Sequence, residues 1–270
     1  MFQLMSLTEK LFLKSKKHSQ KYKKYFNIYD EVFHNFRNKK ITFVEIGILE
    51  GGSLEIWKKF FGNKARIIGI DANPECKKFE RNGYEIYIGD QSDKFFWKSF
   101  FNKVGNVDIV LDDGGHTNEQ QINTIINCVK NINDGGILIV EDTHTSYMKD
   151  FGNPHKFSFI NFAKKIIDDI NFTFPLFSNK KWKFSLNKYI YSIIFYESIA
   201  IFKIGRDRCK TNELMFNSGK SLGIKDFRHN KSSIIKIAGY IRKKIYILRN
   251  VKLKKINYFI KNFMLYKFFK

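Results

Sequence analysis

The chain has 270 residues, of which 43% are hydrophobic and 27% charged, and its formal net charge is +22 at pH 7. This length and apolar content allow one large domain, alone or with an appended segment. The three cysteines are far apart and form no CxxC pair, so they indicate neither a disulfide framework nor a zinc site, and we expect a reducing, cytoplasmic compartment.

The positive charge is concentrated near the C-terminus. Residues 210–270 hold sixteen Lys or Arg residues against Glu213 and Asp226, a net charge of +14. Such a balance is typical of proteins that contact nucleic acid or an anionic membrane, although a general drift of composition towards lysine explains it equally well. Lysines interrupt the apolar residues of the first 20 positions, and no apolar run approaches the roughly 20 residues of a spanning helix. We therefore expect neither a signal peptide nor a membrane-spanning segment.

The first expected element is a helix over residues 8–38. Its aromatic residues recur at helical spacing and are expected mostly to pack against the domain. The apolar stripe consists of Tyr22, Tyr25, Phe26, Tyr29, Val32, Phe33 and Phe36.

A strand, a glycine-bearing turn and the start of a helix come next. Residues 41–53 read ITFVEIGILEGGS. Glycines such as Gly47 and Gly52 let a ligand approach the backbone, and the free N–H groups of the helix N-terminus near Ser53 suit an anion such as a carboxylate. The pattern G-x-x-x-G-G departs from the dinucleotide fingerprint G-x-G-x-x-G, and Glu45 precedes its first glycine. The turn therefore favours a nucleoside that carries an amino acid over one that carries a pyrophosphate.

Two further strands end in acidic residues. The strand over residues 65–71 ends at Asp71, about 20 residues after the glycine turn, where an acid can accept hydrogen bonds from both ribose hydroxyls. The strand over residues 84–88 is followed by Asp90 and Gln91, which are placed to address an adenine edge. Acids at strand ends also serve as turn formers and helix N-caps, and this alternative stays open for each of them.

Polar groups are most concentrated after the next two strands. Residues 107–116 read VDIVLDDGGH, residues 135–144 read GGILIVEDTH, and a helical pattern lies between them. A strand–helix–strand crossover sets its strands parallel, so that their carboxyl ends open on one edge of the sheet. Carboxylates suit Mg²⁺ or Mn²⁺ and an imidazole suits proton removal, whereas helix caps and loop hydrogen bonds are the structural alternative. The side chains expected to converge are Asp113, His116, Glu141 and Asp142.

Five motifs together resemble a known family. They are EIGxxxGGS at 45–53, GID at 69–71, GDQ at 89–91, DDGGH at 112–116 and EDxHTSY at 141–147. The first three are similar to those of class I S-adenosylmethionine-dependent methyltransferases. The last two are more specific and resemble the metal-dependent sugar O-methyltransferases of macrolide tailoring and bacterial surface-polysaccharide pathways.

The resemblance implies a Rossmann-like α/β fold with a seven-stranded, mostly parallel sheet, an antiparallel last strand and helices on both faces. Strands expected over residues 189–195 and 199–204 match that antiparallel end of the sheet. We expect three regions: an N-terminal helical cap (1–40), a methyltransferase domain (41–206) and a basic, helical C-terminal extension (207–270).

The resemblance also assigns roles to residues. Asp113, Glu141 and Asp142 are implied to hold Mg²⁺ or Mn²⁺, and His116 to deprotonate a sugar hydroxyl. His144 is a second candidate base, with an ordinary loop role as the alternative. Relatives often carry a Trp and a His in the N-terminal helix where this chain has Tyr22 and Lys24, which leaves capping of the donor by that helix in doubt. The S-adenosylmethionine pocket is expected to include Tyr29, Glu45, Gly47, Gly52, Ser53, Asp71, Asp90, Gln91 and Asp112.

Several functions are compatible with these residues. The first is O-methylation of a nucleotide-activated sugar, such as a heptose or deoxyhexose, for bacterial capsule or lipooligosaccharide. The alternatives are tailoring of a small molecule such as an antibiotic, methylation of RNA through the basic tail, and a non-catalytic binding module. Nucleic acid is the weaker partner because none of the three prolines lies where a Pro-Pro-aromatic motif would follow the fourth strand.

Two further interactions are expected. Residues 234–270 interleave Lys and Arg with apolar side chains, which suits peripheral contact with an anionic membrane or, alternatively, a helix packed on the domain or on a second subunit. The resemblance also implies a homo-oligomer.

Overall fold

The computed structural model describes residues 5–152, 156–172, 182–210, 215–220 and 222–224. It divides the chain into two compact units, residues 1–213 and 214–270, and the fold below is that of the first. The basic segment expected to contact a membrane, residues 234–270, lies outside the described residues. None of the helices in the described ranges has both the length and the hydropathy needed to cross a membrane.

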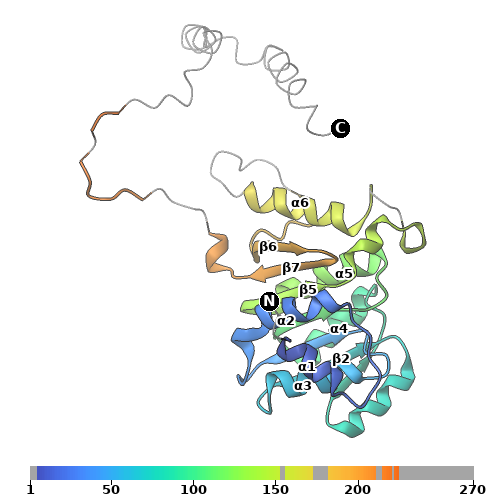
Figure 1. The fold of residues 1–270 in the computed structure, drawn as a ribbon. Helices are drawn as coiled ribbons and strands as arrows, with labels where there is room; N and C mark the ends of the chain where they lie inside the picture. The colour runs from blue at the N-terminus through green and yellow to red at the C-terminus, as the bar shows by residue number, and fades with distance from the viewer. Residues whose placement is uncertain (1–4, 153–155, 173–181, 211–214, 221, 225–270) are drawn as a thin grey trace. The chain divides into compact units, whose positions relative to one another are not determined.

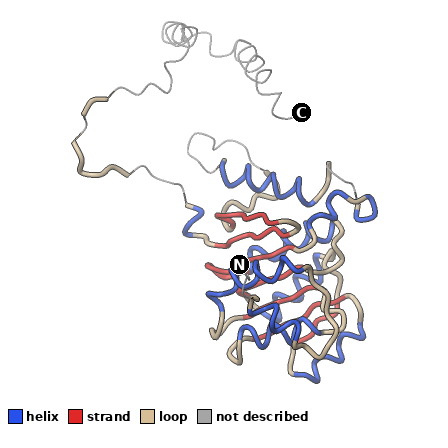
Figure 2. Tube along the Cα trace, viewed as in Figure 1, coloured by secondary structure: helices blue, strands red, loops and turns tan. Residues whose placement is uncertain are grey.

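Seven strands form a single sheet in the order β3-β2-β1-β4-β5-β7-β6 (Figure 2). Strands β1 to β5 pair in parallel, and β7 pairs antiparallel with both β5 and β6. The expected seven-stranded sheet with its antiparallel last strand is thus confirmed. The strands are β1 (Thr42–Ile46), β2 (Arg66–Asp71), β3 (Glu85–Ile88), β4 (Val107–Asp112), β5 (Ile132–Val140), β6 (Ile190–Tyr196) and β7 (Ile199–Ile204).

Helices cover both faces of the sheet (Figure 1). Because successive side chains of a strand point to opposite faces, neighbours such as Phe43 and Val44 of β1 enter two different cores. Helices α1, α2 and α3 close the first core, and α4, α5 and α6 close the second. The helices are α1 (Leu7–Leu13), α2 (Lys23–Phe33), α3 (Gly52–Phe61), α4 (Lys94–Val104), α5 (Asn118–Cys128) and α6 (Phe159–Asn171).

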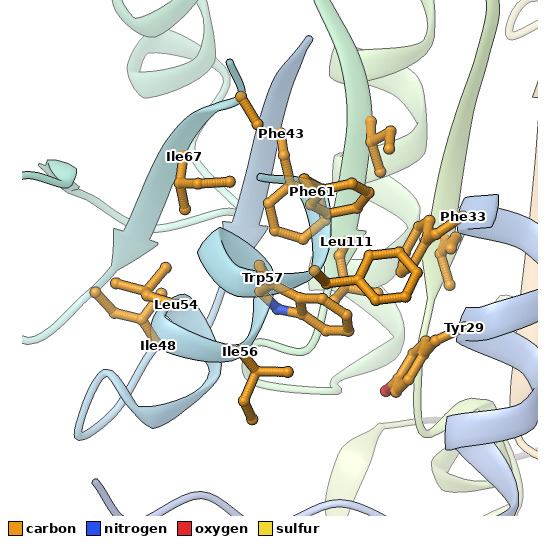
Figure 3. Packing of buried hydrophobic residues seen from close by; sticks show 14 of the residues in the cluster. Tyr29, Phe33, Phe43, Ile48, Leu54, Ile56, Trp57, Phe61, Ile67 and Leu111 are labelled. Atoms are coloured by element: carbon orange, nitrogen blue, oxygen red, sulfur yellow. The ribbon is translucent and has the colours of Figure 1, made fainter. Parts of the chain in front are cut away.

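The first core is rich in aromatic rings (Figure 3). Phe33 of α2 is fully buried, with its ring centroid 5.4 Å from that of Trp57 and 5.3 Å from that of Phe61. Tyr29 stacks on the Phe33 ring one turn earlier in the same helix. The aromatic stripe therefore packs as expected, and it fixes α2 against the domain.

The expected single helix over residues 8–38 is wrong. Helix α1 ends at Leu13 and α2 begins at Lys23, so residues 14–22 form a non-helical connection, which we call the strap. The strap has four lysines and no apolar residue before Tyr22, so a helix there would have no apolar face to bury. Instead the strap makes polar contacts with the domain, and these place it over the carboxyl edge of the sheet.

Candidate functional site

A cavity of about 570 Å³ lies at the carboxyl ends of the parallel strands, where the strand order reverses between β1 and β4. Ligands of open α/β sheets bind at this kind of position. The cavity is lined by the strap, the glycine turn and the residues that follow β2, β3, β4 and β5. Of the residues expected in the site it brings together Gly47, Gly52, Ser53, Asp71, Asp90, Gln91, Asp113, His116, Glu141 and Asp142.

Hydrogen bonds beyond the strand ends set the positions of the site residues. The Gly47 N–H donates to the Ile70 carbonyl at 2.8 Å, and the Asp113 N–H donates to the Ile46 carbonyl at 3.0 Å. The Glu141 N–H donates to the Asp112 carbonyl at 2.9 Å. Each bond extends the ladder by one step, so the carboxylates emerge side by side at the edge of the sheet.

Two of the site residues have left-handed backbone conformations. His116 has a φ of +58° and Asp142 has a φ of +54°, a backbone region that residues other than glycine rarely adopt. Such conformations are costly and are found most often at functional sites. In this site they turn the His116 and Asp142 side chains towards the same cavity.

The acids after β2 and β3 line the cavity and also hold their own turns. Asp71 accepts from the Ile48 and Leu49 N–H groups, both at 3.0 Å, and so fixes the glycine turn. Asp90 accepts from the Ser92 N–H at 2.8 Å. The role of turn former therefore coexists with exposure to the cavity.

Asp112 does not line the cavity but lies behind it, with only 1% of its surface exposed. The Gln91 side-chain amide donates to both Asp112 carboxylate oxygens, at 2.9 and 3.0 Å, and burial raises the pKa of Asp112. Gln91 in turn accepts from the Gly115 N–H at 3.0 Å. The pair therefore supports the loop that follows β4, and Gln91 is already engaged on the side away from the cavity.

Glu45 and Tyr29 also lie behind the cavity wall. The Glu45 carboxylate is fully buried and accepts from the Ser53 hydroxyl at 2.7 Å and from the Trp57 indole N–H at 3.0 Å. Burial raises the pKa of Glu45 to about 7. The Tyr29 hydroxyl donates to Glu141 Oε1 at 2.5 Å, and burial raises the pKa of Tyr29. Both residues can act on a ligand only through the groups that they hold.

Asp113, His116 and Asp142 form a group that could hold a cation. Each offers one ligand atom, and these atoms lie within 4.8 Å of one another. His116 Nε2 is 3.8 Å from Asp113 Oδ1 and 3.7 Å from Asp142 Oδ2. The Tyr25 hydroxyl donates to the other Asp142 oxygen at 2.6 Å. The two carboxylates suit a divalent cation, and His116 Nε2 can serve beside them either as a further ligand or as a base.

Glu141, the third expected metal ligand, lines the cavity but is not part of this group. Its Oε1 accepts from Tyr29, and its Oε2 accepts from the ammonium group of Lys21 at 3.0 Å. Burial raises the pKa of Glu141, and the positive charge of Lys21 opposes that rise.

Lys21, in the strap, is a site residue that sequence reasoning missed. Its ammonium group donates to Asp113 Oδ2 at 2.5 Å and lies 3.9 Å from Glu45 Oε1, and only 4% of its side chain is exposed. Burial lowers the pKa of Lys21, but the negative charges of Asp113, Glu141 and Glu45 outweigh burial and raise that pKa above its ordinary value. One lysine in a lysine-rich stretch gives no sequence signal of such a position.

His144, the second candidate base, does not line the cavity. Its Nδ1 lies 2.8 Å from the Ser198 hydroxyl oxygen, and its ring packs against Tyr22 with centroids 5.9 Å apart. His116 is therefore the histidine that the fold brings to the carboxylates.

No family model matches the chain. Over 153 residues it is 29% identical to the 8-demethyl-8-alpha-L-rhamnosyl tetracenomycin-C 2'-O-methyltransferase of Streptomyces olivaceus, a match that covers 53% of this chain and 40% of the relative. Over 131 residues it is 33% identical to the mycinamicin VI 2''-O-methyltransferase of Micromonospora griseorubida, which covers 46% of this chain and 32% of the relative. The chain thus spans less than half the length of these relatives.

A solved structure is also similar. The MycE methyltransferase from the mycinamycin biosynthetic pathway, in complex with Mg and SAH, superposes with a TM-score of 0.63 at 25% identity. The match covers 72% of this chain and 52% of MycE. The class I methyltransferase fold and the resemblance to O-methyltransferases expected from the sequence motifs are thereby confirmed.

Proposed function

We propose that this chain, which has the class I methyltransferase fold, transfers a methyl group from S-adenosylmethionine to a sugar hydroxyl with the help of a divalent cation. The main support is the convergence of Asp113, His116 and Asp142 on the cavity that the glycine turn also lines. The similar proteins add to it, because two are named as O-methyltransferases and MycE was solved with Mg and SAH.

The donor would lie over the glycine turn. Gly47 and Gly52 line the cavity, and the N-terminus of α3 at Gly52 presents N–H groups to a carboxylate such as that of the methionine part. Asp71 ends β2 and lines the cavity, a position at which an acid can accept from ribose hydroxyls. S-adenosylmethionine would thus meet groups suited to its carboxylate and to its ribose.

The cation would be held by Asp113 and Asp142, with Glu141 and His116 beside them. A bound Mg²⁺ or Mn²⁺ would supply a Lewis acid that lowers the pKa of an acceptor hydroxyl. Tyr25 donates to Asp142 and Tyr29 donates to Glu141, so both carboxylates are oriented from behind. Such supporting hydrogen bonds fix the direction in which a ligand carboxylate points.

His116 is the residue placed to accept a proton. Its Nε2 faces the carboxylates of Asp113 and Asp142, while its Nδ1 is buried without a hydrogen-bond partner among the described residues. A proton taken up at Nε2 would lie beside those carboxylate oxygens, which are 3.8 and 3.7 Å away. His116 can therefore act as the general base for an acceptor hydroxyl.

The acceptor we favour is a sugar within a small glycoside. The names of the relatives contain a rhamnosyl tetracenomycin-C and mycinamicin VI, and neither name contains a nucleotide-activated sugar. These names support antibiotic-type tailoring better than the expected nucleotide-activated sugar of a capsule or lipooligosaccharide pathway.

The proposal can be tested by transfer of labelled methyl from S-adenosylmethionine. The acceptors would be rhamnosides and other glycosides, nucleotide sugars and RNA, each with and without EDTA. We expect transfer to a glycoside that requires Mg²⁺ or Mn²⁺, is lost in His116→Ala and persists in the control His144→Ala. Transfer to RNA that EDTA leaves unchanged would show that the proposed metal site and acceptor are both wrong.

A further inference from the structure

The strap is held against the domain at several points along its length. The Gly52 Cα lies against the strap backbone, since a Cβ built there would be 2.2 Å from the His18 carbonyl oxygen. The Ser15 hydroxyl donates to Glu55 at 3.4 Å, and the Lys17 ammonium lies 4.9 Å from the centre of the Phe79 ring. The strap thus forms part of the cavity wall next to the glycine turn.

Among the described residues of the strap, only Lys21 places its charged group among the carboxylates of Glu45, Asp113 and Glu141. Its side chain is 4% exposed, whereas that of Lys24, three residues later, is 73% exposed and pairs with Glu197 on the surface. Two lysines only three residues apart therefore have opposite environments.

The ammonium group of Lys21 occupies carboxylates that a cation would also need. It binds Asp113 Oδ2, while the other oxygen of Asp113 faces His116. It also binds Oε2 of Glu141, whose Oε1 is already taken by Tyr29. Lys21 therefore supplies the positive charge on this side of the cluster in the present structure.

We propose that Lys21 is an internal cation that competes with a divalent metal for Asp113 and Glu141, so that metal binding displaces its ammonium group and loosens the strap. This inference rests on the metal site of the proposed function. Two positive charges close to the same carboxylates repel each other, and a carboxylate oxygen that binds the ammonium group has less electron density available for a metal. Binding effects are reciprocal. If a bound metal weakens the binding of the ammonium group to the carboxylates by some factor, the bound ammonium group weakens the binding of the metal by the same factor.

The consequence reaches the donor pocket. Residues from His18 to Tyr22 line the same cavity as Gly47, Asp71 and Asp90. Loosening of the strap would therefore change the wall of the cavity where the donor is proposed to bind. Lys21 is in this sense a positioning residue, which acts through the strap and the carboxylates.

Calorimetric titration of the full chain with Mn²⁺ tests the competition directly. We expect Lys21→Met, which keeps the length of the side chain but removes its charge, to bind Mn²⁺ at least about tenfold more tightly than the wild type. Lys24→Met removes an exposed lysine three residues away and is expected to bind as the wild type does. Asp142→Asn should abolish binding and so identify the site that is titrated.

The outcomes separate this inference from the function it rests on. Equal or weaker Mn²⁺ binding by Lys21→Met would refute the competition while leaving the metal site intact. Absence of Mn²⁺ binding in all variants would remove the metal site and the competition together.

Hydrogen exchange of the wild type gives a second readout that does not depend on the folding of a variant. Peptides covering residues 14–22 are expected to exchange faster when Mn²⁺ is added without the donor. Unchanged exchange of the strap at saturating Mn²⁺ would show that the metal does not displace Lys21.

Discussion

Gly47 turns the chain at the end of β1, and its replacement by alanine should damage the site more than its φ angle alone requires. Its φ is +82°, and a Cβ at this position would lie 2.1 Å from the Asp113 carbonyl oxygen. The conformation itself costs an L residue about 1–2 kcal/mol. Ordinary van der Waals contacts begin at 3.4 Å, so the Asp113 backbone must also move. A displacement of about 1 Å at a catalytic group can lower the rate about 100-fold.

Gly83 provides the matched control, because its φ is +81° and a Cβ there would meet nothing within 4 Å. Urea denaturation is expected to show a loss of about 1–2 kcal/mol for Gly83→Ala, with unchanged methyl transfer and Mn²⁺ affinity. For Gly47→Ala we expect a further loss of about 1–3 kcal/mol from the steric overlap, together with weakened transfer and Mn²⁺ binding. Equal effects of the two substitutions would refute the proposed contact between Gly47 and the Asp113 backbone.

Three other predictions concern the walls of the site. Burial raises the pKa of Glu45 to about 7, so the folded state keeps a proton that the unfolded state releases near the ordinary pKa of 4.5. As the pH rises from 4.5 to 7, the free energy of unfolding of the wild type should therefore fall, relative to that of Glu45→Gln, by up to roughly 3 kcal/mol. Urea titrations in which the two proteins show the same pH dependence would contradict this. Phe33→Ala empties the centre of the aromatic core and should lower the free energy of unfolding by about 3–5 kcal/mol in the same assay. Tyr25→Phe removes the hydrogen bond to Asp142 and should weaken Mn²⁺ binding about tenfold, whereas Tyr22→Phe, at a ring that is 59% exposed, should leave the calorimetric affinity unchanged.

The sheet and its polar edge were predictable because both depend on short-range patterns. Short apolar runs that end in acids or glycines indicate buried parallel strands, and the crossover rule then places their carboxyl ends on one edge. The residue groups after β4 and β5 could thus be brought together from the sequence alone. The aromatic stripe of α2 was equally readable, because its spacing is helical and its side chains fill one core.

The remaining features depend on contacts between distant parts of the chain. Lys21 meets Glu141 across 120 positions of sequence, and nothing in the strap differs from an exposed lysine-rich linker. Asp112 and Gln91 carry the expected polar groups, but Asp112 is buried behind the cavity and Gln91 is held there by Asp112 and by Thr124 of α5, which local sequence patterns do not indicate. Helix α4 was also not predicted, because its five aromatic residues do not form a narrow helical stripe.

The balance of charge in the site leaves room for more positive charge than Lys21 supplies. Glu45, Asp113, Glu141 and Asp142 bring four carboxyl groups close together, and burial favours the neutral form of Glu45 and Glu141. Lys21 binds Asp113 and Glu141 and lies 3.9 Å from Glu45, so one positive charge is shared among three of these four groups. Asp113 and Asp142 then face His116 with negative charge that Lys21 alone does not neutralise. A divalent cation is the species that would neutralise it, and its affinity should therefore depend on how firmly the strap holds Lys21 in place.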